Sequence, residues 1–265
     1  MNEIFNVDII KYAFLNGIIV SVLCGFLSFF VVQKKMSFLT VTISHSAFGA
    51  IALALLLKIN QMVTLYILCF LIAFAVYELK KRSKLEFETV LGIFFASSMA
   101  LGVVLIKFAD YGAFDLSGIL FGSILSTGKQ DLYLSGVTSF LIFGIFVILL
   151  DKIIFTMFDE DVAAVSGINT NLINYIILIS ITLVVVICIK LIGIILLTAF
   201  MTIPAAIALS LTKDYRFTIF ISILVSLLIF IFSFYLSYQF DLPPGATTVL
   251  VGTFLYLVVN VLKKR

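Results

Sequence analysis

The sequence predicts an all-α protein, a polytopic membrane bundle of about nine helical spans with its N-terminus outside the cell. Hydrophobic residues make up 63% of the 265 residues, whereas charged residues make up only 12%. Apolar runs follow one another along the chain, and many are close to the roughly 20 residues that a helix needs to cross a bilayer. Lysine and arginine gather at the ends of these runs, where such residues set the orientation of a membrane protein.

Short polar breaks separate the predicted spans. The least distinct break lies at Lys190 and Gly193, inside a nearly continuous apolar stretch. The predicted spans are 11–32, 38–57, 62–79, 89–107, 132–150, 172–189, 192–211, 217–237 and 246–262. They form one transmembrane domain over residues 1–265 and leave no stretch long enough for a soluble domain. A soluble partner must therefore be another chain.

The positive charges favour this arrangement of spans. With an outside N-terminus, twelve lysines and arginines fall on the cytoplasmic side and five on the outer side, which agrees with the positive-inside rule. Merging the two spans around Lys190 would move the last basic residues to the wrong side. The cytoplasmic set is Lys34, Lys35, Lys80, Lys81, Arg82, Lys84, Lys152, Lys213, Arg216, Lys263, Lys264 and Arg265. Because these residues sit at span ends, the net charge of +3 does not indicate a nucleic-acid partner.

His45 is the only histidine, and it lies with Ser44 in a polar patch of the second span. Exposing a strongly polar group to lipid costs on the order of 3 kcal/mol, so such residues usually face a bundle interior or a water-filled path. His45 is therefore either a pathway residue or a neutral imidazole bonded to a neighbouring helix. One imidazole does not make a tight metal site, so further ligands must come from elsewhere.

Glu88 and Pro204 are further candidates. Glu88 opens the fourth span, where a carboxylate favours the helix N-terminus, and it is either a pathway residue or an interfacial acid that reaches water. Pro204 lies inside the seventh span and predicts a kink, because proline removes a backbone hydrogen bond. Such a kink borders a transport path in some proteins and serves packing in others.

The inner loop predicts a short amphipathic helix over about residues 158–167. Acidic residues crowd its first turn, Ala163 lies in its middle, and Gly167 supplies a stop. The acidic residues are Asp159, Glu160 and Asp161. This helix either docks into a groove on a soluble partner or is an ordinary capped turn.

Nothing in the sequence predicts catalysis. The GxSxG and HExxH motifs are absent, and no second histidine exists to pair with a nucleophile. The segment from Gly122 to Lys129 has one residue too many between its glycines for a phosphate-binding loop, and Gln130 follows where Ser or Thr would bind Mg²⁺. An intramembrane enzyme is thus a disfavoured alternative, and any ATP hydrolysis belongs to another chain.

Several stretches, in this order and at these intervals, resemble the permease subunits of bacterial ABC importers of zinc, manganese or iron, the ABC-3 family. The resemblance runs from about Gly17 to the C-terminus. The matching stretches are Lys34-Lys35-Met36-Ser37-Phe38 with Ser44-His45-Ser46, Thr89 to Ile93, Leu120 to Ser123, Asp161 to Gly167, Gly193 to Ala206, and Pro243-Pro244-Gly245-Ala246.

The resemblance implies the membrane subunit of an ATP-driven importer of divalent metal ions that works by alternating access. It implies a second permease copy, ABC ATPase subunits, an extracytoplasmic metal-binding protein and a place in the bacterial cytoplasmic membrane. The metal is the cargo, no intrinsic cofactor is expected, and the partner binds ATP. It further implies that His45, with Ser44 and Glu88, lines the metal path, that Asp159 to Gly167 couples to the ATPase, and that Pro204 lies at a gate. An ABC permease for another small solute is the alternative.

The sequence departs from the family near the histidine. Many relatives have Gly-Asp four to five residues before it, where this chain has Thr40 and Val41. A carboxylate one helical turn from His45 would face the same way and offer a second ligand. Without it, we expect a weaker and transient contact between the metal and His45.

Overall fold

The structure, a computed structural model, describes residues 8–108 and 128–263 and contains only helices in that part of the chain. Nine segments of the described residues are long and apolar enough to cross a membrane, which confirms the predicted all-α bundle. The stretch from Leu120 to Ser123 lies outside the described residues. The helices are α1 (Asp8–Gln33), α2 (Ser37–Leu57), α3 (Gln61–Arg82), α4 (Phe87–Phe108), α6 (Lys129–Phe158), α7 (Glu160–Val165), α8 (Thr170–Phe200), α9 (Ile203–Leu211), α10 (Tyr215–Phe240) and α11 (Pro244–Lys263).

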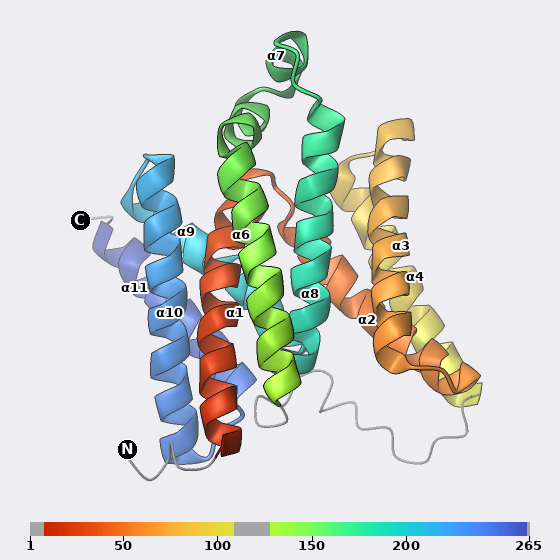
Figure 1. The fold of residues 1–265 in the computed structure, drawn as a ribbon, viewed down its shortest axis with the longest axis vertical. Coiled ribbons are helices and arrows are strands. Elements are labelled where there is room, and N and C mark those ends of the chain that lie inside the picture. Colours follow the sequence, from red (N-terminus) through yellow and green to blue (C-terminus); the bar gives the residue numbers. More distant parts are fainter. Residues whose placement is uncertain (1–7, 109–127, 264–265) are drawn as a thin grey trace.

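Helix α8 lies between two groups of helices (Figure 1). One group contains α2, α3 and α4, and the other contains α1, α6, α9, α10 and α11. Helix α8 packs against members of both groups, and its first half is mostly buried although it is apolar all round. A helix that is apolar on every face is expected inside a bundle, and α8 therefore forms the common wall between the two groups.

Small residues bring α1 and α10 into close contact. The Ser222 hydroxyl donates to the Gly25 carbonyl oxygen at 2.6 Å, and the Ser226 hydroxyl donates to the Ser21 carbonyl oxygen at 2.7 Å. A Cβ atom on Gly25 would lie 2.7 Å from the Ser226 Cβ atom and 2.9 Å from the Ser222 carbonyl oxygen. Small residues permit this close approach of two backbones, as is common between membrane helices.

The substitution Gly25→Ala is expected to destabilise the protein by about 1–3 kcal/mol, because the added methyl group forces α1 and α10 apart. The matched control is Gly144→Ala on α6, where a Cβ atom would meet nothing within 4 Å. Thermal unfolding in detergent should show a lower midpoint for Gly25→Ala and an unchanged or higher one for the control. Equal midpoints for the two variants would contradict this account of the α1–α10 contact.

Close packing also fixes α2 against α4. The Ser46 and Ser98 hydroxyls are hydrogen-bonded at 3.1 Å, and the Thr42 hydroxyl lies 3.3 Å from the Leu91 carbonyl oxygen. A Cβ atom on Gly49 would lie 2.9 Å from the Ser98 carbonyl oxygen. The face of α2 that carries Ser46 thus packs against α4. This packing sets the orientation of the neighbouring His45.

Two interruptions shape the chain between residues 170 and 211. Gly193 inside α8 has φ 77° and ψ 169°, a conformation that L residues rarely adopt, and it marks the break predicted near Lys190. The two sides of this break count as separate membrane spans. The second interruption lies at Met201 and Thr202, between α8 and α9.

The kink predicted at Pro204 is corrected by the structure. Pro204 lies in the first turn of α9 rather than inside a continuous helix. Backbone N–H groups in the first turn have no partner within the helix, so the missing N–H of Pro204 costs no helical hydrogen bond. The helix is interrupted before Pro204, at Met201 and Thr202. The Ala205 N–H donates to the buried Ser28 hydroxyl at 3.1 Å. Pro204 therefore starts a new helix that is anchored to α1.

Candidate metal pathway

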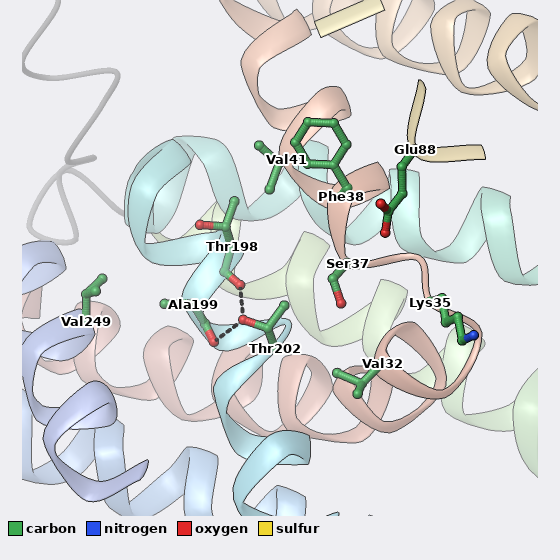
Figure 2. A pocket seen from close by; sticks show the side chains of 10 residues that line it. All are labelled: Val32, Lys35, Ser37, Phe38, Val41, Glu88, Thr198, Ala199, Thr202 and Val249. Atoms are coloured by element: carbon green, nitrogen blue, oxygen red, sulfur yellow. Dashed lines mark hydrogen bonds between the residues drawn. The ribbon is translucent and has the colours of Figure 1, made fainter. Parts of the chain in front are cut away.

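A cavity of about 610 Å³ lies where the two helix groups meet (Figure 2). Its walls come from the end of α1, the α1–α2 turn, α2, α4, the end of α8 and α11. The α1–α2 turn and the start of α4 lie at the same end of the bundle as α7, at the top of Figure 1. The lining residues are Val32, Lys35, Ser37, Phe38, Val41, Glu88, Thr198, Ala199, Thr202 and Val249.

The cavity lining carries four side chains with oxygen atoms and one ammonium group, that of Lys35. Glu88 contributes a carboxylate, and Ser37, Thr198 and Thr202 contribute hydroxyls (Figure 2). The Thr202 hydroxyl donates to the Thr198 carbonyl oxygen at 2.9 Å, which satisfies it locally. Among residues 8–108 and 128–263, no three His, Cys, Asp or Glu side chains gather closely enough to hold a metal ion. The lining therefore offers scattered oxygen atoms rather than the compact ligand set of a tight metal site.

His45 lies one helical turn beyond Val41, which lines the cavity. The His45 Nδ1 atom is 2.9 Å from the Val41 carbonyl oxygen, and since a carbonyl oxygen only accepts, Nδ1 donates this hydrogen bond. In a neutral imidazole the other nitrogen, Nε2, then keeps its lone pair. A backbone carbonyl that fixes the ring in this way is the usual arrangement of a metal-binding histidine. The His45 and Phe95 rings pack in an edge-to-face arrangement, with ring centroids 4.9 Å apart.

The structure separates the three predicted pathway residues. His45 is half-buried, whereas Ser44 is fully buried and its hydroxyl donates to the Val41 carbonyl oxygen at 2.9 Å. Ser44 does not line the cavity. Glu88 lies in the first turn of α4, is exposed and lines the cavity. The geometry thus groups Glu88 with the cavity, places His45 one turn from its wall, and leaves Ser44 as part of the helix interior.

The predictions from sequence omitted several lining residues. Ser37, Thr198 and Thr202 carry the hydroxyls of the cavity, yet each is a small polar residue of a kind that is common in membrane helices. Their only signal in the sequence is that Ser37 lies two residues after the basic pair and that Thr202 lies two residues before Pro204. The broken chain between α8 and α9 brings the two threonines to the cavity.

The substitution Val41→Asp is expected to strengthen metal binding, because it places a carboxylate on the cavity wall one turn from His45. We expect at least about a tenfold higher affinity for Zn²⁺ or Mn²⁺ in equilibrium dialysis of the purified protein, by analogy with the effect of single groups on metal sites. The control is Val41→Asn, which adds a neutral side chain of the same size. If the aspartate and asparagine variants bound metal equally, the proposed second ligand position would be wrong.

Helix α7 is a short helix between α6 and α8, and it is capped at both ends. The Asp159 carboxylate accepts from the Asp161 N–H at 3.0 Å and the Val162 N–H at 2.9 Å, which caps the helix. Gly167 has φ 84° and ends it, and the Ile168 N–H donates to the Ala163 carbonyl oxygen at 3.1 Å.

One residue of α7 is buried, and the rest of the helix is exposed. Ala163 is 0% exposed, whereas the apolar side chains of Val162 and Val165 are 49% and 91% exposed. Apolar side chains exposed on a short protruding helix suit a groove on a partner. The acids of this helix stand out in the sequence, whereas the two valines do not.

Comparison with known proteins identifies the family. The sequence profile of the ABC 3 transport family matches residues 6–263, which is nearly the whole chain. The chain belongs to the ABC 3 transport family. It is a permease of the metal-type ABC transporters, as the sequence analysis predicted.

Relatives of known name cover almost the full length of this ABC 3 family permease. It is 28% identical over 251 residues to the high-affinity zinc uptake system membrane protein ZnuB of Haemophilus influenzae, covering 95% of this chain and 96% of that protein. It is 27% identical over 249 residues to the manganese transport system membrane protein MntC of Listeria innocua, covering 94% and 89%. The solved structure of PsaBC from Streptococcus pneumoniae in complex with Fab aligns with a TM-score of 0.83 at 27% identity, covering 95% of this chain and 90% of that chain.

Proposed function

We propose that this permease imports divalent zinc, manganese or iron ions by alternating access, driven by a separate ATPase chain. The metal passes His45 and the cavity that contains Glu88, and the ATPase docks on α7. The family and the names of its relatives support metal as the cargo. The observation that carries the proposal is the position of His45, a fixed imidazole one turn from a cavity on the α7 side of the bundle.

The chemistry of the cavity favours transit over storage. His45 offers one nitrogen, and the cavity lining offers one carboxylate and three hydroxyl oxygens beside the ammonium group of Lys35. A transporter must bind its ion well enough to admit it and weakly enough to release it. One imidazole with scattered oxygen ligands meets both needs, because several strong ligands would be required for a stable complex.

The family of this chain supports an assembly with further subunits. We propose two permease copies, two ABC ATPase subunits and an extracytoplasmic metal-binding protein, in the cytoplasmic membrane of a bacterium. The N-terminus lies outside and α7 inside, as the distribution of lysine and arginine favours. Helix α7 is the coupling helix, with Asp159 as its cap and Glu160 and Asp161 in its first turn.

Purification of the intact complex in mild detergent tests this assembly. We expect a subunit with Walker motifs and a metal-loaded binding protein to co-purify with the permease. A cysteine engineered at Ser166 should react with a membrane-impermeant label only in opened cells. Isolation without any ATPase, or labelling of intact cells, would refute the proposed assembly or its orientation.

A further inference from the structure

Three side chains from distant parts of the sequence form a polar triad at the base of α7. The Lys34 Nζ atom donates to the Asn174 Oδ1 atom at 2.7 Å, and the Asn174 Nδ2 atom donates to the Glu160 Oε1 atom at 2.6 Å. The Lys34 Nζ atom also lies 3.9 Å from the Glu160 Oε2 atom. Asn174 thus bridges a lysine and a glutamate, using both its acceptor and its donor.

The triad differs from an ordinary surface ion pair because the Lys34 side chain is largely buried. The Lys34 side chain is only 11% exposed, whereas that of Glu160 is 52% exposed. Desolvation lowers the pKa of Lys34, and the nearby Glu160 carboxylate opposes this shift. A charge that is taken out of water needs partners, so loss of Glu160 or Asn174 leaves the buried ammonium group poorly compensated. The triad therefore holds its three segments in one arrangement.

Each member of the triad belongs to a different element of the fold. Glu160 is the first residue of α7, Asn174 lies in the first turns of α8, and Lys34 lies in the α1–α2 turn. This turn is short and tightly bonded, since the Met36 N–H donates to the Val31 carbonyl oxygen at 2.8 Å and Lys35 has φ 55°. A displacement of Lys34 must therefore move the start of α2 as well.

The α1–α2 turn also joins the two helix groups and borders the cavity. Helix α1 belongs to one group and α2 to the other, and the next residues after Lys34 that line the cavity are Lys35 and Ser37. Helix α2 carries His45 two turns farther on. The triad thus connects α7 directly to the turn that joins the two groups.

We propose that the triad of Lys34, Asn174 and Glu160 transmits movement of α7 to the α1–α2 turn and so opens or closes the cavity. This inference rests on the proposed function of α7 as the coupling helix. Lys34, Asn174 and Glu160 act as positioning residues, because they contact neither the metal nor ATP. Their loss should uncouple ATP hydrolysis from transport. The binding of metal and of ATP should persist.

The test measures metal transported per ATP hydrolysed by the permease and its ATPase, purified together and placed in proteoliposomes. For Lys34→Met and Glu160→Gln we expect this ratio to fall at least about fivefold while ATP hydrolysis continues. Lys152→Met on α6 and Glu86→Gln before α4 make the same charge changes at exposed positions and should leave the ratio unchanged. An unchanged ratio in Lys34→Met and Glu160→Gln would overturn the inference.

A charge exchange guards against variants that simply fold poorly. We expect Lys34→Glu and Glu160→Lys to lose coupling singly, and the double variant to regain at least half of the wild-type ratio, since the Asn174 amide can turn to serve the reversed pair. A double variant no better than the worse single variant would overturn the inference. If the wild-type complex itself moved no metal with ATP, the proposed function would fail, which is a different result from an unchanged ratio in the variants.

Discussion

Replacement of His45 by alanine is expected to reduce metal transport at least about tenfold while the complex still assembles and hydrolyses ATP. The Nδ1 atom of His45 is fixed by the Val41 carbonyl oxygen at 2.9 Å, which leaves Nε2 free to contact a passing ion. Among the described residues no other cluster of metal ligands could replace it. Loss of the imidazole would therefore remove the one nitrogen ligand of the proposed path.

The control for this prediction lies on the same helix. Thr40 is fully buried, its hydroxyl donates to the Ser37 carbonyl oxygen at 2.7 Å, and it does not line the cavity. Thr40→Ala should transport metal within about twofold of the wild type, because it loses a local hydrogen bond worth about 1 kcal/mol. Uptake of radiolabelled metal by metal-limited cells measures both variants. Normal uptake by His45→Ala would make the histidine a structural residue.

Val165→Glu is expected to prevent the ATPase from binding, without harm to the fold of the permease. The Val165 side chain is 91% exposed, so a charge there costs the isolated permease little. In a closed interface the same carboxylate would be buried without a partner, at a cost of about 2 kcal/mol or more, which lowers affinity more than tenfold. Metal transport should fall with the loss of the ATPase.

Co-purification measures this effect, with thermal stability of the permease as the check on folding. The matched control is Leu85→Glu in the α3–α4 loop, which adds the same charge at an apolar side chain that is 49% exposed. The control should retain the ATPase. If Val165→Glu bound the ATPase as well as the wild type does, α7 would not be the docking element.

The spans could be predicted from sequence because lipid imposes a simple rule on backbone and side chains. Only helices satisfy their own backbone groups in lipid, so apolar length and charge at the ends define the elements. The break near Lys190 and Gly193 was predictable because a single merged span would put the last basic residues on the wrong side. The structure places a φ of 77° at Gly193. Pro204 was misplaced because its position in a helix depends on the break at Thr202, which apolar composition does not reveal.

The candidate site was only partly predictable because its members meet through packing. His45 and Glu88 stand out as ionisable residues near or inside apolar runs. Thr198 and Thr202 line the cavity because α8 ends at Phe200, between them. Ser44 does not line it, and its hydroxyl donates to the Val41 carbonyl oxygen of its own helix. The link between Lys34 and Asn174 spans 140 positions of sequence, and no local pattern indicates such a contact.

Metal transport by the reconstituted complex tests the central claim most directly. The permease should be purified with its ATPase and binding protein, placed in proteoliposomes, and supplied with radiolabelled zinc, manganese or iron. Our account predicts that at least one of these metals crosses the membrane with ATP and stays behind when the ATPase is inactive. Equal movement with the active and the inactive ATPase, for all three metals, would contradict it.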